Sequence, residues 1–119
     1  MTTHSFNTMT RAMGVEKIHF DSISENDMVL FQTMNGVYQF RVTDPTLRSG
    51  ILTGGGLGDQ QREAVLIGSL IDDAYHSGLA VRSRAIFWMC EASQCESLMT
   101  SELVGLTLVR DLIEQRRAA

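Results

Sequence analysis

The sequence lacks a long apolar run. Its longest membrane-like stretch, from Leu103 to Val109, is interrupted by Gly105 and Thr107, whereas a helix that spans a membrane needs about 20 apolar residues. Residues 1–20 also lack the basic start and the apolar stretch of a secretory signal. The sequence therefore excludes a transmembrane helix, and we expect a cytoplasmic protein without a membrane partner.

Cysteine and proline are scarce as well, with two cysteines and one proline among 119 residues. Two cysteines are too few for a fold held by disulfides, and a cytoplasmic chain keeps its thiols reduced, so we expect Cys90 and Cys95 to be free. Their spacing also fits facing positions on a tight hairpin, where a bond could form. A zinc site needs two further ligands, and no second cysteine pair is present, so we expect no metal.

The chain has no excess of positive charge. Ten lysine and arginine residues stand against fourteen aspartate and glutamate residues, and the net charge is -4. Binding to nucleic acid requires a concentrated positive field. The charge balance therefore argues against nucleic acid as a partner.

Alternating apolar and polar residues are what the chain does have, and they predict β strands after residue 26. The clearest signal is Asn35-Gly36 between two apolar runs, because these residues tolerate the positive φ angles of a type I′ hairpin turn. In this register Phe31 pairs with Phe40, so the turn and the apolar pattern agree. The alternative is one long strand with a glycine bulge.

Further strands are predicted at short intervals, over residues 49–53, 64–71, 79–90 and 104–109. Because no helix of about ten residues separates them, the fold class is mainly all-β: a small antiparallel barrel or sandwich of about five to seven strands with short terminal helical segments. We expect a weakly patterned N-terminal segment over 1–26, the β domain over 27–109, and a short helical tail over 110–119.

The predicted strand 79–90 carries a candidate interface. Alternation places four residues on one side, and the residues between them form an apolar side that faces the core; the four are Arg82, Arg84, Ile86 and Trp88. Two large apolar side chains turned away from the core need a cover, from a terminal segment or from a second subunit. The arginines then lie at the polar rim, although the alternatives are an ordinary solvent face, a cluster that contacts an anion, and a bulge that reverses the alternation.

Two loops carry an alternative, polar site. The glycine loop Gly54–Gly58 lacks the Gly-Lys-Ser/Thr ending of a phosphate loop, and Asp59 takes the place of the last glycine in the dinucleotide fingerprint. Asp72, Asp73 and His76 form a second polar loop, which matches no ligand template and is typical of a solvated turn. In the alternative interpretation, the two loops form the rim of a ligand site.

The three histidines are far apart in the sequence. His4 and His19 lie in the weakly patterned N-terminal segment, whereas His76 lies in the polar loop. A site with several histidines therefore requires the N-terminal segment to fold over the β domain.

Several short motifs together resemble a group of small bacterial proteins of uncharacterised function. That group has a Thr-x-Asn-x-x-Tyr strand, an Asp-Pro turn, a Gly-Gly turn and a closing Thr-Ser-x-x-Val strand; the corresponding residues here begin at Thr33, Asp44, Gly54 and Thr100. The likeness covers about residues 30–109. It implies a single compact β domain and transfers no catalytic residue.

No nucleophile with its partners is recognisable, because Gly68-Ser69-Leu70 lacks the second glycine of a nucleophile elbow and neither cysteine has a histidine nearby. We therefore expect a non-enzymatic small β-barrel module, without a cofactor, that acts by protein–protein binding or by self-association as a homodimer. The alternative is an enzyme or a ligand-binding barrel for a small molecule, with the two polar loops at its rim.

Overall fold

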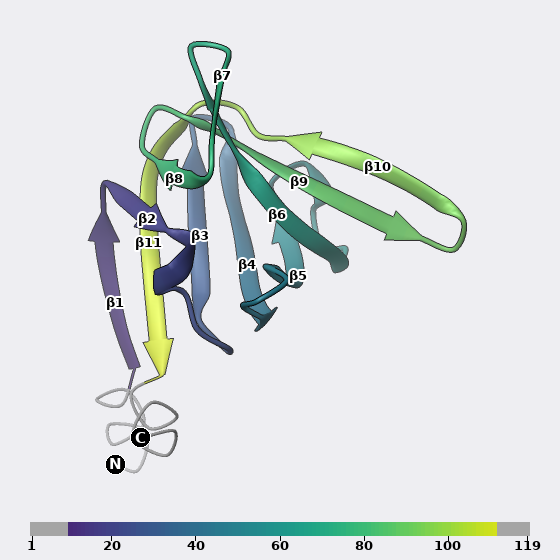
Figure 1. Cartoon of the computed structure of the whole chain (residues 1–119), viewed down its shortest axis with the longest axis horizontal. Coiled ribbons are helices and arrows are strands. Elements are labelled where there is room, and N and C mark those ends of the chain that lie inside the picture. Colours follow the sequence, from purple (N-terminus) through teal and green to yellow (C-terminus); the bar gives the residue numbers. More distant parts are fainter. Residues whose placement is uncertain (1–9, 112–119) are drawn as a thin grey trace.

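The computed structural model describes residues 10–111, which form an all-β domain (Figure 1). The strands of a nine-stranded antiparallel sheet are β1 (Thr10–Val15), β3 (Met28–Thr33), β4 (Gly36–Asp44), β5 (Ser49–Gly54), β6 (Arg62–Ile71), β7 (Ala74–His76), β9 (Arg84–Glu91), β10 (Gln94–Met99) and β11 (Leu103–Asp111). A two-stranded sheet contains β2 (Lys17–His19) and β8 (Gly78–Ala80). The predicted all-β class is confirmed.

The large sheet is not closed into a barrel, so of the predicted barrel or sandwich the barrel is wrong. Its strand order is β1-β11-β3-β4-β5-β6-β9-β10, with β7 added to β6. The edge strands β1 and β10 do not pair with each other, and the β9–β10 hairpin projects away from β1 (Figure 1). The strand number also exceeds the predicted range.

No α-helix occurs within residues 10–111; the only helical segments there are the 3-10 turns η1 (Phe20–Ser22) and η2 (Gly55–Leu57). Residues 10–15 of the N-terminal segment, for which a short terminal helical segment is expected from the sequence, form β1, because β11 offers them an edge to pair with, in a register that joins Thr10 to Asp111. The predicted helical tail falls on residues 110–119, of which 112–119 lie outside the described residues. No helix in the described part of the chain is long and apolar enough to cross a membrane.

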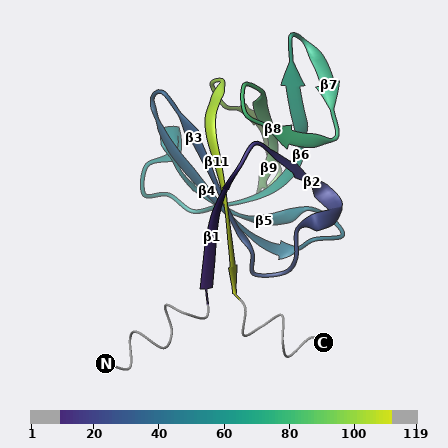
Figure 2. The same cartoon turned by 90° about the vertical axis from the view of Figure 1, so that its left-hand side faces the viewer.

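The core lies on the inward face of the large sheet. Phe31, Phe40 and Phe87 are fully buried, and the Phe87 ring lies 5.3 Å from the Phe31 ring and 5.4 Å from the Phe40 ring, measured between centroids. These three rings join β3, β4 and β9 across the sheet. Buried residues of β2, η1, β8 and the segment before β3 add to this core: Ile18, Phe20, Ile23 and Leu79. The weakly patterned N-terminal segment thus contributes part of the core. Its strand β2 lies beside β8 (Figure 2).

The predicted hairpin between β3 and β4 is present, but its register differs. Thr33 pairs with Gly36, so the two turn residues are Met34 and Asn35. Asn35 does not have a positive φ angle, and the predicted type I′ turn at Asn35-Gly36 is wrong. The Thr33 hydroxyl explains the shift, because it accepts a hydrogen bond from the Asn35 N–H and donates one to the Gly36 carbonyl oxygen, both at 3.1 Å.

The register differs from the prediction by an even number of residues, which leaves every side chain on its predicted face. Phe31 pairs with Tyr38 instead of Phe40, and Phe40 pairs with Val29. Phe31, Phe40 and Val29 are nonetheless all buried. The apolar pattern therefore predicts the faces correctly, although it does not determine the pairing.

Candidate functional site

The predicted alternation is confirmed over β9, but the single strand predicted over 79–90 is wrong, because residues 81–83 form a turn in which Arg82 has a φ angle of 80°. Ala85, Phe87 and Met89 are buried on the inward face, whereas Ile86 is half-buried and Trp88 is 43% exposed on the outward face. No bulge within β9 reverses this order. Trp88 is a large aromatic side chain that the described residues leave partly uncovered.

Neighbouring strands extend the apolar surface around Trp88. Trp88 lies directly opposite Val65 of β6 on one side and Ser97 of β10 on the other. Ile86 lies opposite Met99 of β10, whose side chain is 50% exposed. These positions share one side of the sheet, because directly opposed residues point to the same face.

Tyr75 of β7 continues this surface at the other side of β6. A Cβ atom added to Gly68 would lie only 2.6 Å from the Tyr75 ring, so the ring covers this glycine. The Tyr75 hydroxyl donates a hydrogen bond to the Ile67 carbonyl oxygen at 2.8 Å. We call the surface formed by Val65, Tyr75, Ile86, Trp88 and Met99 the outward apolar face.

A disulfide joins Cys90 and Cys95, and the expectation of free thiols is wrong. The two residues lie directly opposite each other on β9 and β10, with their Cα atoms 4.0 Å apart. Their position two residues from Trp88 places the disulfide on the same side of the sheet as the outward apolar face. Facing positions on a tight hairpin are the alternative that the cysteine spacing allows, and the register of β9 and β10 places the two cysteines there.

Arg62 of β6 fastens the β9–β10 hairpin to the rest of the sheet. Its guanidinium lies 3.5 Å from a carboxylate oxygen of Glu91 on β9 and 3.3 Å from one of Glu96 on β10. Both glutamates are largely exposed, so each ion pair contributes little to stability by itself. Together with the disulfide, they hold the two strands of the hairpin in one orientation.

The arginines of the candidate interface lie beside acidic residues. A hollow of about 350 Å³ has Arg82 and Arg84 in its wall together with Asp72, Asp73 and Glu102. Met99 also lines it, so this mixed-charge hollow borders the outward apolar face. The carboxylates offset the positive charge of the two arginines, which argues against an anion site at this position.

Asp72 and Asp73 are the two central residues of a tight turn between β6 and β7. Both have positive φ angles, 50° and 65°, and Ile71 pairs with Ala74 on either side of them. Positive φ at both central residues of a two-residue hairpin loop defines a type I′ turn. The turn type that the sequence analysis placed at Asn35-Gly36 thus occurs between β6 and β7.

The glycine loop and the Asp72–His76 loop do not share a rim. The first precedes β6 and the second follows its end, so the 10 residues of β6 separate them, at about 3.3 Å per residue. Gly55 has a φ angle of 51°, and a Cβ atom there would lie 2.2 Å from the Tyr38 ring. The Gly56 N–H donates a hydrogen bond to the Tyr38 hydroxyl at 3.2 Å. Packing against Tyr38 therefore shapes this loop.

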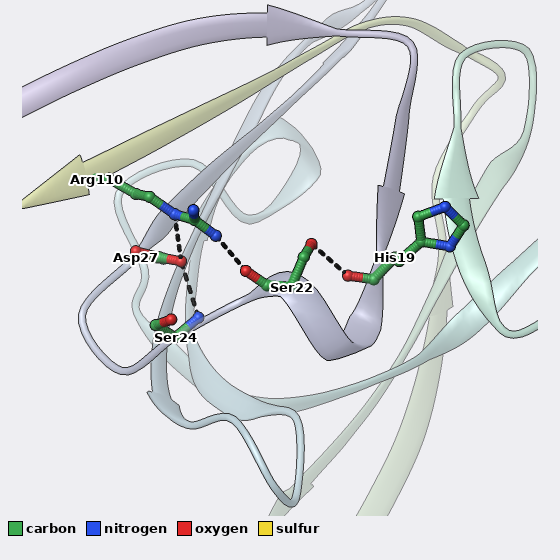
Figure 3. A network of polar contacts seen from close by, with 5 residues as sticks. All are labelled: His19, Ser22, Ser24, Asp27 and Arg110. Carbon is green, nitrogen blue, oxygen red and sulfur yellow. Dashed lines mark hydrogen bonds and ion pairs between the residues drawn. The ribbon is translucent and has the colours of Figure 1, made fainter. Parts of the chain in front are cut away.

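A buried carboxylate that the sequence analysis missed lies between β11 and η1 (Figure 3). Asp27 is 2% exposed, and its Oδ2 atom accepts hydrogen bonds from the Ser24 N–H at 2.8 Å and from Nε of Arg110 at 3.3 Å. Arg110 also donates to the Ser22 carbonyl oxygen. The contact joins residues 83 positions apart in the chain, for which the sequence offers no local signal.

The N-terminal segment does fold over the β domain, as a site with several histidines requires. β2 pairs with β8, and this brings Lys17 and His19 to a hollow that His76 also lines. Within residues 10–111, no group of three or more histidine, cysteine, aspartate or glutamate residues could hold a metal ion. The hollow is therefore considered below as a site for another kind of ligand.

Comparison of the chain with protein-family models, with curated proteins and with solved structures finds no match. The resemblance to small bacterial β proteins stays a prediction.

Proposed function

We propose that the protein is a non-enzymatic β module that acts by self-association, with the outward apolar face as its contact surface and a second copy of the chain as its partner. The observation that carries this proposal is the position of Trp88, 43% exposed and surrounded by the half-buried Val65 and Ile86 and the exposed Met99. Aromatic residues at the centre of an apolar patch are typical of the energetically dominant residues of interfaces.

The charges at the border of the face favour a second copy as the partner. Arg82 and Arg84 lie beside Asp72, Asp73 and Glu102 at one end of the outward apolar face. In a two-fold dimer one surface patch serves both partners, so it must complement itself. A border that contains both signs of charge meets this requirement, whereas a border of one sign repels its own copy.

Packing two sheets face to face is the geometry that covers Trp88. Sheets packed in this way lie about 10 Å apart, with side chains from both inner faces between them. The disulfide and the Arg62 ion pairs keep β9 and β10 in place, which lowers the entropic cost of presenting this face. The arginines at the border then contribute mainly to the salt dependence of association.

The mass of the protein in solution tests the proposal. Light scattering at tens of micromolar should give the mass of a dimer for the wild-type chain, since about 7 kcal/mol of binding shows in this range. Trp88→Ala combined with Ile86→Ser should give a monomer. Met34→Ser combined with Leu47→Ser is the matched control, because both residues are exposed and lie outside the outward apolar face, and it should remain a dimer. A monomeric wild type rejects the proposal.

The alternative function, a small-molecule site over both polar loops, has less support. The glycine loop packs against Tyr38 at one end of β6, and Asp72 and Asp73 form a turn at the other end. His76 lines the hollow beside β2 and β8, whereas Asp72 and Asp73 line the mixed-charge hollow, and neither hollow includes a residue of the glycine loop.

A further inference from the structure

The pairing of β2 with β8 turns two basic side chains toward the β6–β7 hairpin. Ile18 lies opposite Leu79, and both are buried. Successive residues of a strand point to opposite sides, so Lys17 and His19 point away from this buried pair. The His19 imidazole points away from the Asp27–Arg110 ion pair (Figure 3).

His76 reaches the same place from β7. It lies directly opposite Ser69 of β6, and directly opposed residues share a face. Ser69 is 1% exposed, and its hydroxyl donates a hydrogen bond to the Gly78 carbonyl oxygen at 2.7 Å, which ties β6 to β8. His76 therefore lies on the side that faces β8 and β2, opposite to Tyr75 and the outward apolar face.

These residues surround a hollow of about 280 Å³. Lys17, His19 and His76 supply polar side chains, whereas the half-buried Ile71 and Ala80 supply accessible apolar surface; Ala80 lies directly opposite Lys17 and so shares its face. No aspartate or glutamate within residues 10–111 lines it. The hollow thus combines hydrogen-bond donors of positive or neutral charge with an apolar wall.

We propose that this hollow binds a small organic anion, with a carboxylate or phosphate group held by Lys17, His19 and His76 and an apolar body against the half-buried Ile71 and Ala80. Ammonium and imidazole N–H groups are donors suited to such acceptors. The hollow has room for more than a single small ion, because its volume is several times the roughly 30 Å³ that one water molecule occupies. The site lies on a different surface from the proposed dimer contact and does not depend on it.

Titration of the wild-type chain with four probes tests the ligand class. Benzoate and phenyl phosphate carry the two anionic groups on the same ring, benzyl alcohol is the neutral counterpart, and inorganic phosphate lacks the apolar body. At least one of the two aromatic anions should bind saturably and shift the imidazole NMR signals of both His19 and His76. The neutral and the inorganic probe should each bind at least about tenfold more weakly, because each lacks one half of the interaction.

Single substitutions identify the residues that hold the anion. Lys17→Met and His76→Gln should each weaken binding of the better aromatic anion by about tenfold. Arg41→Met is the matched control for the loss of one charge, because Arg41 is exposed on β4 and outside the hollow, and it should leave binding unchanged. Each substituted residue is exposed, so the fold should tolerate all three changes.

Four results overturn the proposal. The first three are the absence of saturable binding by either aromatic anion, equal binding of benzyl alcohol, and an equal loss of binding in Arg41→Met. The fourth comes from a separate titration with Zn²⁺, in which the imidazole signals shift although no anionic probe shifts them. The last result assigns the histidine pair to a metal ion instead. Similar affinities for benzoate and phenyl phosphate support a site for anions in general, whereas a preference identifies the acidic group.

Discussion

Arg110, near the end of β11, lies against the buried carboxylate of Asp27, with Nε 3.3 Å from Oδ2. Asp27 also holds the chain ahead of β3, because its carbonyl oxygen accepts a hydrogen bond from the Val42 N–H at 2.8 Å. The ion pair thus connects the last described strand to the loop where the first sheet contacts of β3 begin.

Removal of the Arg110 guanidinium should destabilise the fold. Arg110→Met leaves the Asp27 carboxylate buried with the backbone N–H of Ser24 as its one remaining hydrogen-bond donor among the described residues. This loss should lower the free energy of unfolding by about 2 kcal/mol. Urea denaturation followed by circular dichroism measures this loss. Arg41→Met serves as the control for charge removal on the surface, and equal stability of the two variants contradicts the structural role of the pair.

Reduction of the disulfide should weaken the β9–β10 hairpin. The Cys90–Cys95 bond closes a short loop, for which chain entropy gives a stabilisation of about 2 kcal/mol or less. Reductant should therefore lower the melting temperature of the wild type, while the double variant Cys90→Ser with Cys95→Ser should melt at the same temperature in either buffer. A wild type that is indifferent to reductant shows that the thiols are free.

The Cys90–Cys95 disulfide also bears on the cellular compartment of the protein. A disulfide is unusual in the cytoplasm, where thiols are kept reduced. The cytoplasmic location stays a prediction, and blocking of free thiols during extraction from the natural source, followed by mass measurement, tests it directly. A bonded pair at the time of extraction contradicts it.

Two glycines of one loop separate a steric cost from a backbone cost. Gly55 and Gly58 have similar positive φ angles, 51° and 62°. A Cβ atom added at Gly55 would meet the Tyr38 ring, whereas a Cβ atom added at Gly58 would have no non-neighbouring atom within 4 Å. Gly58 also has a ψ angle of -126°, outside the left-handed helical region, so Gly58→Ala should cost about 1–3 kcal/mol through the backbone alone. Gly55→Ala should in addition displace the Tyr38 ring, so its cost in urea denaturation should fall in a Tyr38→Ala background, whereas the cost of Gly58→Ala should not. A Gly55→Ala cost that is equal in both backgrounds contradicts the packing of Tyr38 on the loop.

The turn between β6 and β7 should accept a better turn sequence. Asp72 and Asp73 occupy the two positive-φ positions, for which Asn-Gly is the preferred pair. Asp72→Asn combined with Asp73→Gly should raise the free energy of unfolding by about 0.5 kcal/mol, as judged from the relief of backbone strain. The same two residues placed at Ala92 and Ser93 form a comparison, since only Ala92 has a positive φ there. A loss of stability at 72–73 contradicts the turn type.

Side-chain alternation predicts faces in this protein better than it predicts pairing. Phe87 and Trp88 are neighbours on β9, and the sequence correctly places the first in the core and the second outside it. Alternation repeats every two residues, so it cannot distinguish Phe31 paired with Phe40 from Phe31 paired with Tyr38. The choice depends on the Thr33 hydroxyl, whose hydrogen bonds form only after the turn exists.

Contacts between distant segments could not be predicted from the sequence, for a different reason. Lys17 and His19 lie in a polar stretch with a weak pattern, and only the pairing of β2 with β8 brings them beside His76. Asp27 and Arg110 likewise meet only because β11 pairs with β3. A local pattern contains no information on which strand a given edge will pair with. The barrel was wrongly predicted for this reason, because closure depends on whether the two edge strands pair.

The place of β11 in the sheet has a consequence for how the chain folds during synthesis. β11 is the last described strand to leave the ribosome, yet it lies between β1 and β3, which are made first. Until it arrives, β3 has one open edge and β1 has no partner among the described strands. Pairings of such high sequence separation form slowly, and unpaired strand edges promote aggregation. A nascent chain that stops before Leu103 should therefore depend on chaperones for its solubility.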